Sequence, residues 1–144
     1  MSVDPRTLGW LGRALNHELS AVQQYLAQSV LARLWGDEAL AVELRREAVE
    51  ELSHAERLME RLILAGVAPS AGTLAPARLG RDVATLLTAD GRLEMDAVRL
   101  YQQALSHAQR VRDADNANVL SEILHEEAAH VAELQSLSAG ARHG

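Results

Sequence analysis

The stretch EELSHAERL, residues 50–58, sets acids, a histidine and an arginine among apolar residues. The surrounding apolar residues recur every three or four positions, which is typical of a helix that buries one face. The stripe consists of Leu44, Ala48, Glu51, Ala55, Leu58 and Leu62. Glu51 falls on this stripe, so we expect its carboxylate in a helical core. His54 lies one turn further along the same face.

Three other segments share this periodicity, which predicts four long helices. We expect them at about residues 5–35, 38–65, 82–111 and 115–137, followed by a frayed tail at 138–144. Asp90-Gly91 is a weak point or a kink in the third helix. Proline and glycine gather between the second and third helices, which predicts a long connection. Two hairpins joined by a long crossover indicate an all-α four-helix bundle, with residues 1–144 as a single domain.

The amino-acid composition excludes several types of ligand, catalytic group and partner. The 144 residues include no cysteine, which excludes thiol ligands, and all 14 basic residues are arginine, which excludes lysine-based catalysis. The net charge of −6 and the lack of a basic run argue against nucleic acid as a partner. The N-terminus does not resemble a signal peptide, and no apolar run reaches the roughly 18 residues of a membrane span. We expect a soluble, cytoplasmic protein.

Each of the other three stripes also contains one glutamate. These are Glu18, Glu94 and Glu127. An offset of 76 residues relates the two halves of the chain: it carries Glu18 onto Glu94, Tyr25 onto Tyr101, Glu51 onto Glu127 and His54 onto His130. The two hairpins therefore look like copies, related by a pseudo-twofold axis.

Four buried carboxylates need compensating charge, because an unpaired ionised group in a core takes up a proton or destabilises the fold. None of the stripes contains an arginine. Two divalent cations would balance four glutamates, with two neutral histidines as further ligands. One glutamate from each of two helices, with Glu-x-x-His from each of the others, is the composition of di-iron and di-manganese carboxylate bundles. Such oxygen-rich ligands suit Fe(II) or Mn(II).

A third Glu-x-x-His, formed by Glu122 and His125, lies off the apolar stripe. The 76-residue offset relates it to Arg46 and Val49, which form no such motif. We interpret this pair as surface residues. His17, His107 and His143 are also expected at the surface.

Over roughly residues 5–137 the chain resembles the bacterioferritins. The resemblance rests on NHELSAVQQYLAQ (16–28), EELSHAERLMERLILAGVAP (50–69), RLEMDAV (92–98) and EILHEEAAHVAEL (122–134). It implies a ferroxidase centre in which Glu51 and Glu127 bridge two metals, and in which Glu18 with His54, and Glu94 with His130, are terminal ligands. It also implies oxidation of Fe(II) by oxygen or hydrogen peroxide and storage of ferric mineral in a 24-subunit cage. We expect Tyr25 beside the metals, as a hydrogen-bond partner or electron donor.

Three positions depart from the family pattern. Leu52 occupies the place of the methionine that holds haem between two subunits, so haem is not expected. Glu47 and Glu50 match acids of an inner-surface iron site, but Arg46 replaces its histidine. We expect no counterpart of the short fifth helix that follows the bundle in the family.

Other functions remain open at this point. A dimer without a cage would use the same di-iron or di-manganese centre to detoxify oxygen or peroxide, or to oxidise another substrate. A haem-binding dimer for electron transfer would need a haem ligand other than Leu52. A purely structural helical partner would need its core carboxylates to be paired within the protein.

Overall fold

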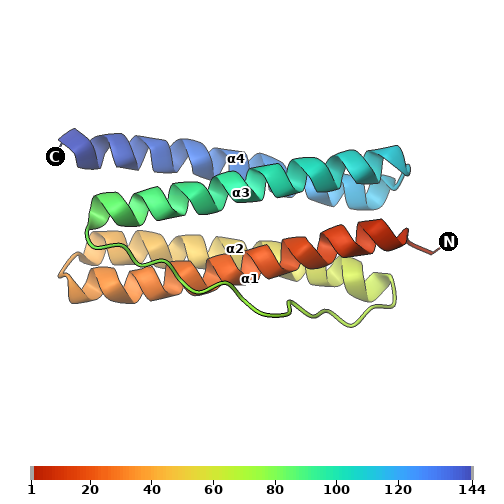
Figure 1. Cartoon of the computed structure of the whole chain (residues 1–144), viewed down its shortest axis with the longest axis horizontal. Coiled ribbons are helices and arrows are strands. Elements are labelled where there is room, and N and C mark those ends of the chain that lie inside the picture. The colour runs from red at the N-terminus through yellow and green to blue at the C-terminus, as the bar shows by residue number, and fades with distance from the viewer. Residues whose placement is uncertain (1, 144) are drawn as a thin grey trace.

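The structure is a computed structural model that describes residues 2–143. It contains the helices α1 (Pro5–Leu34), α2 (Glu38–Leu64), α3 (Val83–Arg110) and α4 (Ala114–His143). Figure 1 shows α1 and α2 as one antiparallel hairpin and α3 and α4 as a second, with the crossover returning along the length of the bundle. The predicted all-α four-helix bundle with a long crossover is confirmed.

Aspartates cap the N-termini of α1 and α3. Asp4 Oδ2 accepts hydrogen bonds from the backbone N–H groups of Arg6 and Thr7, which satisfies two donors that the first turn of a helix leaves free. Asp82 and Thr85 form a reciprocal capping box at the start of α3. Between α1 and α2 the chain reverses at Gly36, whose φ of 83° favours a residue without a side chain.

The predicted tail at 138–144 is wrong for most of its length, because α4 continues to His143. The segment contains no proline, and a single glycine, Gly140, costs only about 1 kcal/mol relative to alanine in a helix. Residue 144 lies outside the described residues. α3 likewise continues unbroken through Asp90 and Gly91.

His107 is buried rather than exposed as expected. Its Nε2 lies 2.7 Å from Oδ2 of Asp4, because the N-terminal residues fold over this end of α3. His17 is half-buried, and the side chain of His143 lies outside the described part of the chain.

The apolar core consists of two clusters. One contains Leu11 and Leu15 of α1 with Leu58, Tyr101 and Ile123 of the other helices. The second is built from the other end of each helix and includes Ala21, Tyr25, Leu44, Leu86 and Leu134. On every helix the predicted buried glutamate lies between the residues of the first cluster and those of the second. A polar layer therefore separates two apolar layers along the bundle.

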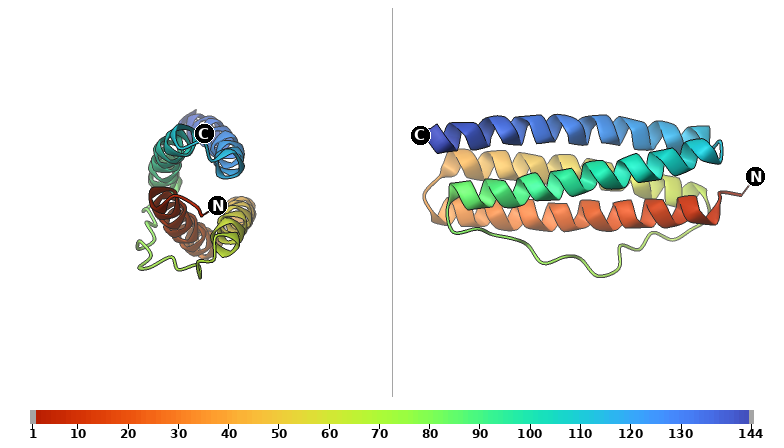
Figure 2. Two further views of the ribbon diagram at one scale, coloured as in Figure 1. Left: turned by 90° about the vertical axis from the view of Figure 1, so that its right-hand side faces the viewer. Right: turned by 45° about the horizontal axis from the view of Figure 1, so that its top comes forward.

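The crossover is attached to the outside of α1. Asn16 donates hydrogen bonds to the backbone carbonyls of Ala71 and Thr73, and Gln28 donates one to that of Arg78. Figure 2 shows the crossover outside the bundle and places α2 and α4 side by side on the opposite flank. Within residues 2–143, no helix combines the length and hydropathy needed to cross a bilayer.

Candidate metal centre

The polar layer contains the six residues singled out from the sequence. All are buried: Glu18, Glu51 and Glu127 are fully inaccessible, and Glu94, His54 and His130 are at most 6% exposed. They come from all four helices, since helical periodicity turns the same face inward at each position. The structure therefore brings the predicted set together at one level of the bundle.

These side chains form two overlapping groups, each compact enough to hold a metal ion. The first consists of Glu18, Glu51, His54 and Glu127. The second consists of Glu51, Glu94, Glu127 and His130. In each group the nearest ligand atoms all lie within 4.8 Å of one another. Glu51 and Glu127 belong to both groups, and each group has one further glutamate and one histidine.

The inward-facing atoms of this cluster lack hydrogen-bond partners. They are both carboxylate oxygens of Glu51 and of Glu127, one oxygen each of Glu18 and Glu94, and Nδ1 of His54 and His130. His54 Nδ1 lies 2.8 Å from Glu127 Oε1, but without the geometry of a hydrogen bond. Across the described residues, the arginine ion pairs all involve other acids. Unsatisfied buried polar atoms are costly, so this donor set fits divalent cations.

The pKa shifts of the metal-free cluster also indicate a site that fits divalent cations. Burial, reinforced by repulsion from Glu51, raises the pKa of Glu18 well above its ordinary value. Burial likewise raises the pKa of Glu94 well above 4.5 and that of Glu127 to about 7. Burial alone would lower the pKa of His130, but the neighbouring carboxylates of Glu51 and Glu94 favour the charged imidazolium and raise it to about 12. In the metal-free cluster, bound protons therefore compensate the negative charge of the glutamates that bound cations would otherwise balance.

Each histidine is held from outside by a carboxylate of the opposite hairpin. His54 Nε2 lies 2.5 Å from Oε2 of Glu126, and His130 Nε2 lies 2.5 Å from Oε2 of Glu50. A carboxylate at Nε2 favours the tautomer with a proton on Nε2, which leaves Nδ1 free to face the cluster.

Sequence reasoning missed Glu126 and the contact of Glu50 with a histidine. The 76-residue offset carries Glu50 onto Glu126, just as it carries His54 onto His130. This relation could have indicated that the two glutamates have equivalent roles.

The tyrosines form a reciprocal pair. The hydroxyl of Tyr25 donates a hydrogen bond to Oε1 of Glu94 at 2.5 Å, and the hydroxyl of Tyr101 donates one to Oε1 of Glu18 at 2.8 Å. Each bond joins α1 to α3 and uses Oε1 of the glutamate. Oε2 of the same glutamate has no hydrogen-bond partner and remains available to a metal. The tyrosines therefore fix the orientation of the two glutamates that belong to only one group each.

A second polar cluster adjoins this layer. Asp90, fully buried on α3, accepts a hydrogen bond from Gln24 Nε2 at 3.0 Å. Asp90 Oδ2 and Gln28 Oε1 lack partners, and burial raises the pKa of Asp90 to about 7. A proton on Asp90 would supply the missing donor. Sequence reasoning treated Asp90 only as a weak point of α3, because its burial depends on side chains of α1.

One side of the centre opens toward solvent between α2 and α4. The two histidines form the floor of a cavity of about 360 Å³. Its walls include Glu50, Glu126 and Glu133. Acidic walls raise the local concentration of cations, so this opening is suited to the entry of metal ions.

Glu47 and Glu50 were predicted as a further metal site, and Glu50 lines this opening whereas Glu47 is buried beside it. With His130 they form a third compact group. Burial raises the pKa of Glu47 to about 7. Arg46 pairs with Glu50 at 2.9 Å and lies 3.6 Å from Glu47, so a guanidinium already provides the positive charge there.

The Glu-x-x-His motif that lies off the apolar stripe is outside the cluster. Glu122 and His125 are both exposed, as predicted, and Glu122 pairs with Arg57.

Four antiparallel helices around two overlapping carboxylate–histidine groups define a metal-binding helical bundle. The Ferritin-like domain family matches residues 10–142. A bacterioferritin of Brucella melitensis is 33% identical over 131 residues, which cover 91% of this chain and 81% of that protein. Bacterioferritins of Rhodobacter capsulatus and Streptomyces coelicolor are each 30% identical, over 91% and 94% of this chain and 81% of theirs. The chain therefore belongs to the ferritin-like family and, within it, to the bacterioferritins.

Proposed function

We propose that this chain is a ferroxidase, which oxidises Fe(II) to Fe(III) at a two-metal centre within one subunit and thereby serves iron storage and detoxification. The observation that carries the proposal is the pair of four-residue groups that share Glu51 and Glu127. In this assignment Glu51 and Glu127, which belong to both groups, would be the ligands shared by the two metals. Glu18 with His54, and Glu94 with His130, are the terminal ligands.

The substrate is a pair of ferrous ions, and oxygen or hydrogen peroxide is the electron acceptor. Two ferrous ions supply two electrons, which with two protons reduce oxygen to hydrogen peroxide, or hydrogen peroxide to water. The donor set also suits Mn(II), so manganese is a second possible occupant. Haem is not part of the proposal, since Leu52 has no donor atom.

The side chains around the centre have distinct tasks. Tyr25 and Tyr101 orient the terminal glutamates, and Glu126 and Glu50 orient the histidines. The acidic opening between α2 and α4 admits cations. Protons held by Glu18, Glu94 and Glu127 leave as metal binds, because a ligand carboxylate must be ionised.

The direct test adds Fe(II) stepwise in air while oxygen consumption and protein-bound ferric iron per subunit are measured. Wild-type protein should oxidise at least two ferrous ions per subunit. The variant Glu51→Gln/His54→Ala should lose this activity. The matched control is Glu122→Gln/His125→Ala, which alters the exposed Glu-x-x-His on α4 and should oxidise iron like wild type. Equal rates in the two variants would refute the assignment.

Arg46 favours a second candidate within the same chemistry. Because Arg46 neutralises Glu47 and Glu50, transfer of iron beyond the centre is weakened. The chain would then act as a di-iron or di-manganese oxidase, or a peroxide-detoxifying dimer, without mineral. Bound ferric iron that stops at two per subunit supports this candidate, and far more than two supports storage.

We further propose that the chain assembles with copies of itself, as a dimer or as a 24-subunit cage. The support is an exposed apolar face on the first hairpin. It comprises Leu26, Val30, Val42, Val49, Leu52 and Ile63. On α2 these positions follow helical spacing, which places them along one side. Exposed apolar side chains aligned in this way suit an interface, and a second copy is the partner that the family relationship favours.

A further inference from the structure

A second cavity lies between α1 and α3, toward the N-terminus of α1. Its volume is about 730 Å³, within the range of small-molecule sites. The residues that line it fall within 5–13 of α1 and 102–110 of α3. The apolar cluster with Leu11, Leu15 and Tyr101 separates it from the metal centre. It therefore plays no part in the proposed iron chemistry.

The charge of this cavity is opposite to that of the protein as a whole. Its lining includes Arg6, Arg13 and Arg110 and no acidic residue, although the chain carries a net charge of −6. In the described part of the chain, none of these three arginines takes part in an ion pair, whereas Arg46 and Arg57 do. The nearby Asp4 is engaged by His107 and by backbone N–H groups of the first turn.

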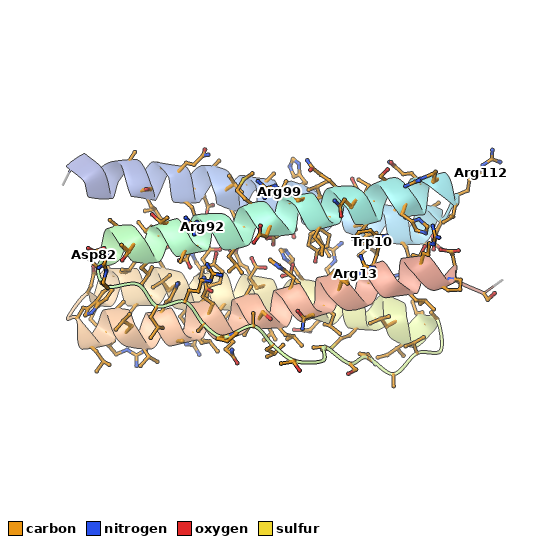
Figure 3. All side chains as sticks on the ribbon, in the orientation of Figure 1. Trp10, Arg13, Asp82, Arg92, Arg99 and Arg112 are labelled. Atoms are coloured by element: carbon orange, nitrogen blue, oxygen red, sulfur yellow. The ribbon has the colours of Figure 1, made fainter. Side chains whose placement is uncertain are left out.

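Trp10 gives the cavity an aromatic wall. The guanidinium carbon of Arg13 lies 4.3 Å from the centre of the Trp10 ring, a cation–π contact that holds the Arg13 side chain over the ring. Figure 3 shows both residues on α1, on the side that faces α3. Gln102 and Ser106 of α3 supply polar groups to the opposite wall.

We propose that this cavity binds a small organic anion that carries phosphate groups, of the size of a nucleoside polyphosphate. Guanidinium groups bind phosphate oxygens through paired hydrogen bonds. Three guanidiniums match the several charges of a polyphosphate, whereas a single carboxylate would neutralise only one. Trp10 then packs against the organic part of the ligand, and Gln102 and Ser106 bond its polar groups.

The experiment titrates ATP and inorganic pyrophosphate into the full-length protein without added iron, at constant ionic strength. Trp35→Phe leaves Trp10 as the only tryptophan, so its fluorescence reports on the cavity. We expect a saturable change in Trp10 emission with both probes. Tighter binding of ATP would show that the organic part contributes, and equal binding would show that the phosphates suffice; both results support the site.

Arginine variants make the test specific. In the same background, Arg6→Gln and Arg110→Gln should each weaken binding by about tenfold or more, because a hydrogen bond to a charged group corresponds to at least that factor. Arg45→Gln removes an exposed arginine of α2, outside the cavity, and should bind like the parent. Circular dichroism checks that each variant keeps its helices.

Three results would overturn the proposal. One is a fluorescence change that never saturates. Another is equal binding by Arg6→Gln, Arg110→Gln and Arg45→Gln. The third is a change of particle size in the cavity variants, which would make this surface a contact between subunits. Since iron is left out, none of these results bears on ferroxidase activity.

Discussion

The hydroxyl of Tyr25 on α1 lies 2.5 Å from Oε1 of Glu94 on α3 and donates a hydrogen bond across the bundle. The hydroxyl of Tyr101 on α3 donates the equivalent hydrogen bond to Glu18 on α1. The halves of the chain are therefore joined at the metal centre by two equivalent bonds, each between an aromatic residue of one hairpin and a proposed ligand of the other. This symmetry supplies matched pairs of variants.

Tyr25→Phe should slow iron oxidation by about tenfold, because one hydrogen bond to a charged group is lost. Metal stoichiometry should be retained. The measurement is the initial rate of Fe(II) oxidation, with Tyr101→Phe as the matched variant. Equal losses would show that both tyrosines position glutamates. A loss confined to Tyr25→Phe, together with disappearance of a tyrosyl radical signal in electron paramagnetic resonance, would identify Tyr25 as an electron donor. Wild-type rates in both variants would contradict either role.

Glu126→Gln should weaken metal binding by about 10- to 100-fold, the usual effect of removing a carboxylate that orients a ligand histidine. Glu50→Gln should have a similar effect at His130. Anaerobic titration with Fe(II) or Mn(II) measures the affinity. Glu56→Gln, which alters an exposed acid of α2, is the control. If all three variants bind metal alike, Glu126 and Glu50 are only surface charges.

Asp90 should make the metal-free protein less stable as pH rises from about 4 to 7. The folded state raises the pKa of this carboxyl from 3.8 to about 7, so the folded protein binds this proton more strongly than the unfolded chain. Stability from this group is therefore present at low pH and lost as pH rises through 7. Buried Glu127 and Glu47 contribute in the same direction.

Asp90→Asn should remove part of that dependence, because an amide mimics the protonated acid and remains neutral. Thermal unfolding measured at pH 5 and pH 8 should show a smaller fall in Tm than wild type. Asp96→Asn, an exposed substitution on the same helix, should leave the fall unchanged. An unaltered fall in Asp90→Asn would mean that Asp90 ionises freely in the folded state.

Arg112 offers a test of backbone strain. It has a φ of 59° in the turn between α3 and α4 (Figure 3). Gly36, with a φ of 83°, occupies the equivalent place between α1 and α2. Left-handed backbone costs a residue with a side chain about 1 kcal/mol or more. Arg112→Gly should therefore raise the free energy of unfolding by about that amount in chemical denaturation. Arg112→Ala loses the side chain but keeps the strain, so it should show no such gain.

Leu52→Arg should reduce the size of the assembly. Leu52 is 43% exposed on the apolar face of the first hairpin, and a charge buried in an interface without a partner is costly. Analytical ultracentrifugation measures particle mass. Met95→Arg, at 38% exposure on α3, is the control and should assemble like wild type. Unchanged mass in Leu52→Arg would exclude this face as the main contact.

Helical spacing was sufficient to predict that the six residues of the candidate metal centre are buried together, since a stripe every three or four positions determines which side chains face inward. It was not sufficient for Glu126, because the neighbouring Glu127 occupies the stripe and only the packing of α4 against α2 brings Glu126 to His54. Burial of His107 and Asp90 likewise depends on distant partners, Asp4 and Gln24. Local helix propensity also underestimated the length of α4, because the single glycine near its C-terminal end does not interrupt the helix.

The distribution of ligands among the helices has a consequence for synthesis on the ribosome. Both candidate metal groups include Glu127 of α4, which emerges after α1, α2 and α3. The nascent first hairpin presents Glu18, Glu51 and His54, so the first group lacks Glu127 and the second group has only one of its four residues. In the proposed function, iron capture at the full site would therefore wait until α4 has been synthesised, and a nascent chain that stops before α4 would lack it altogether.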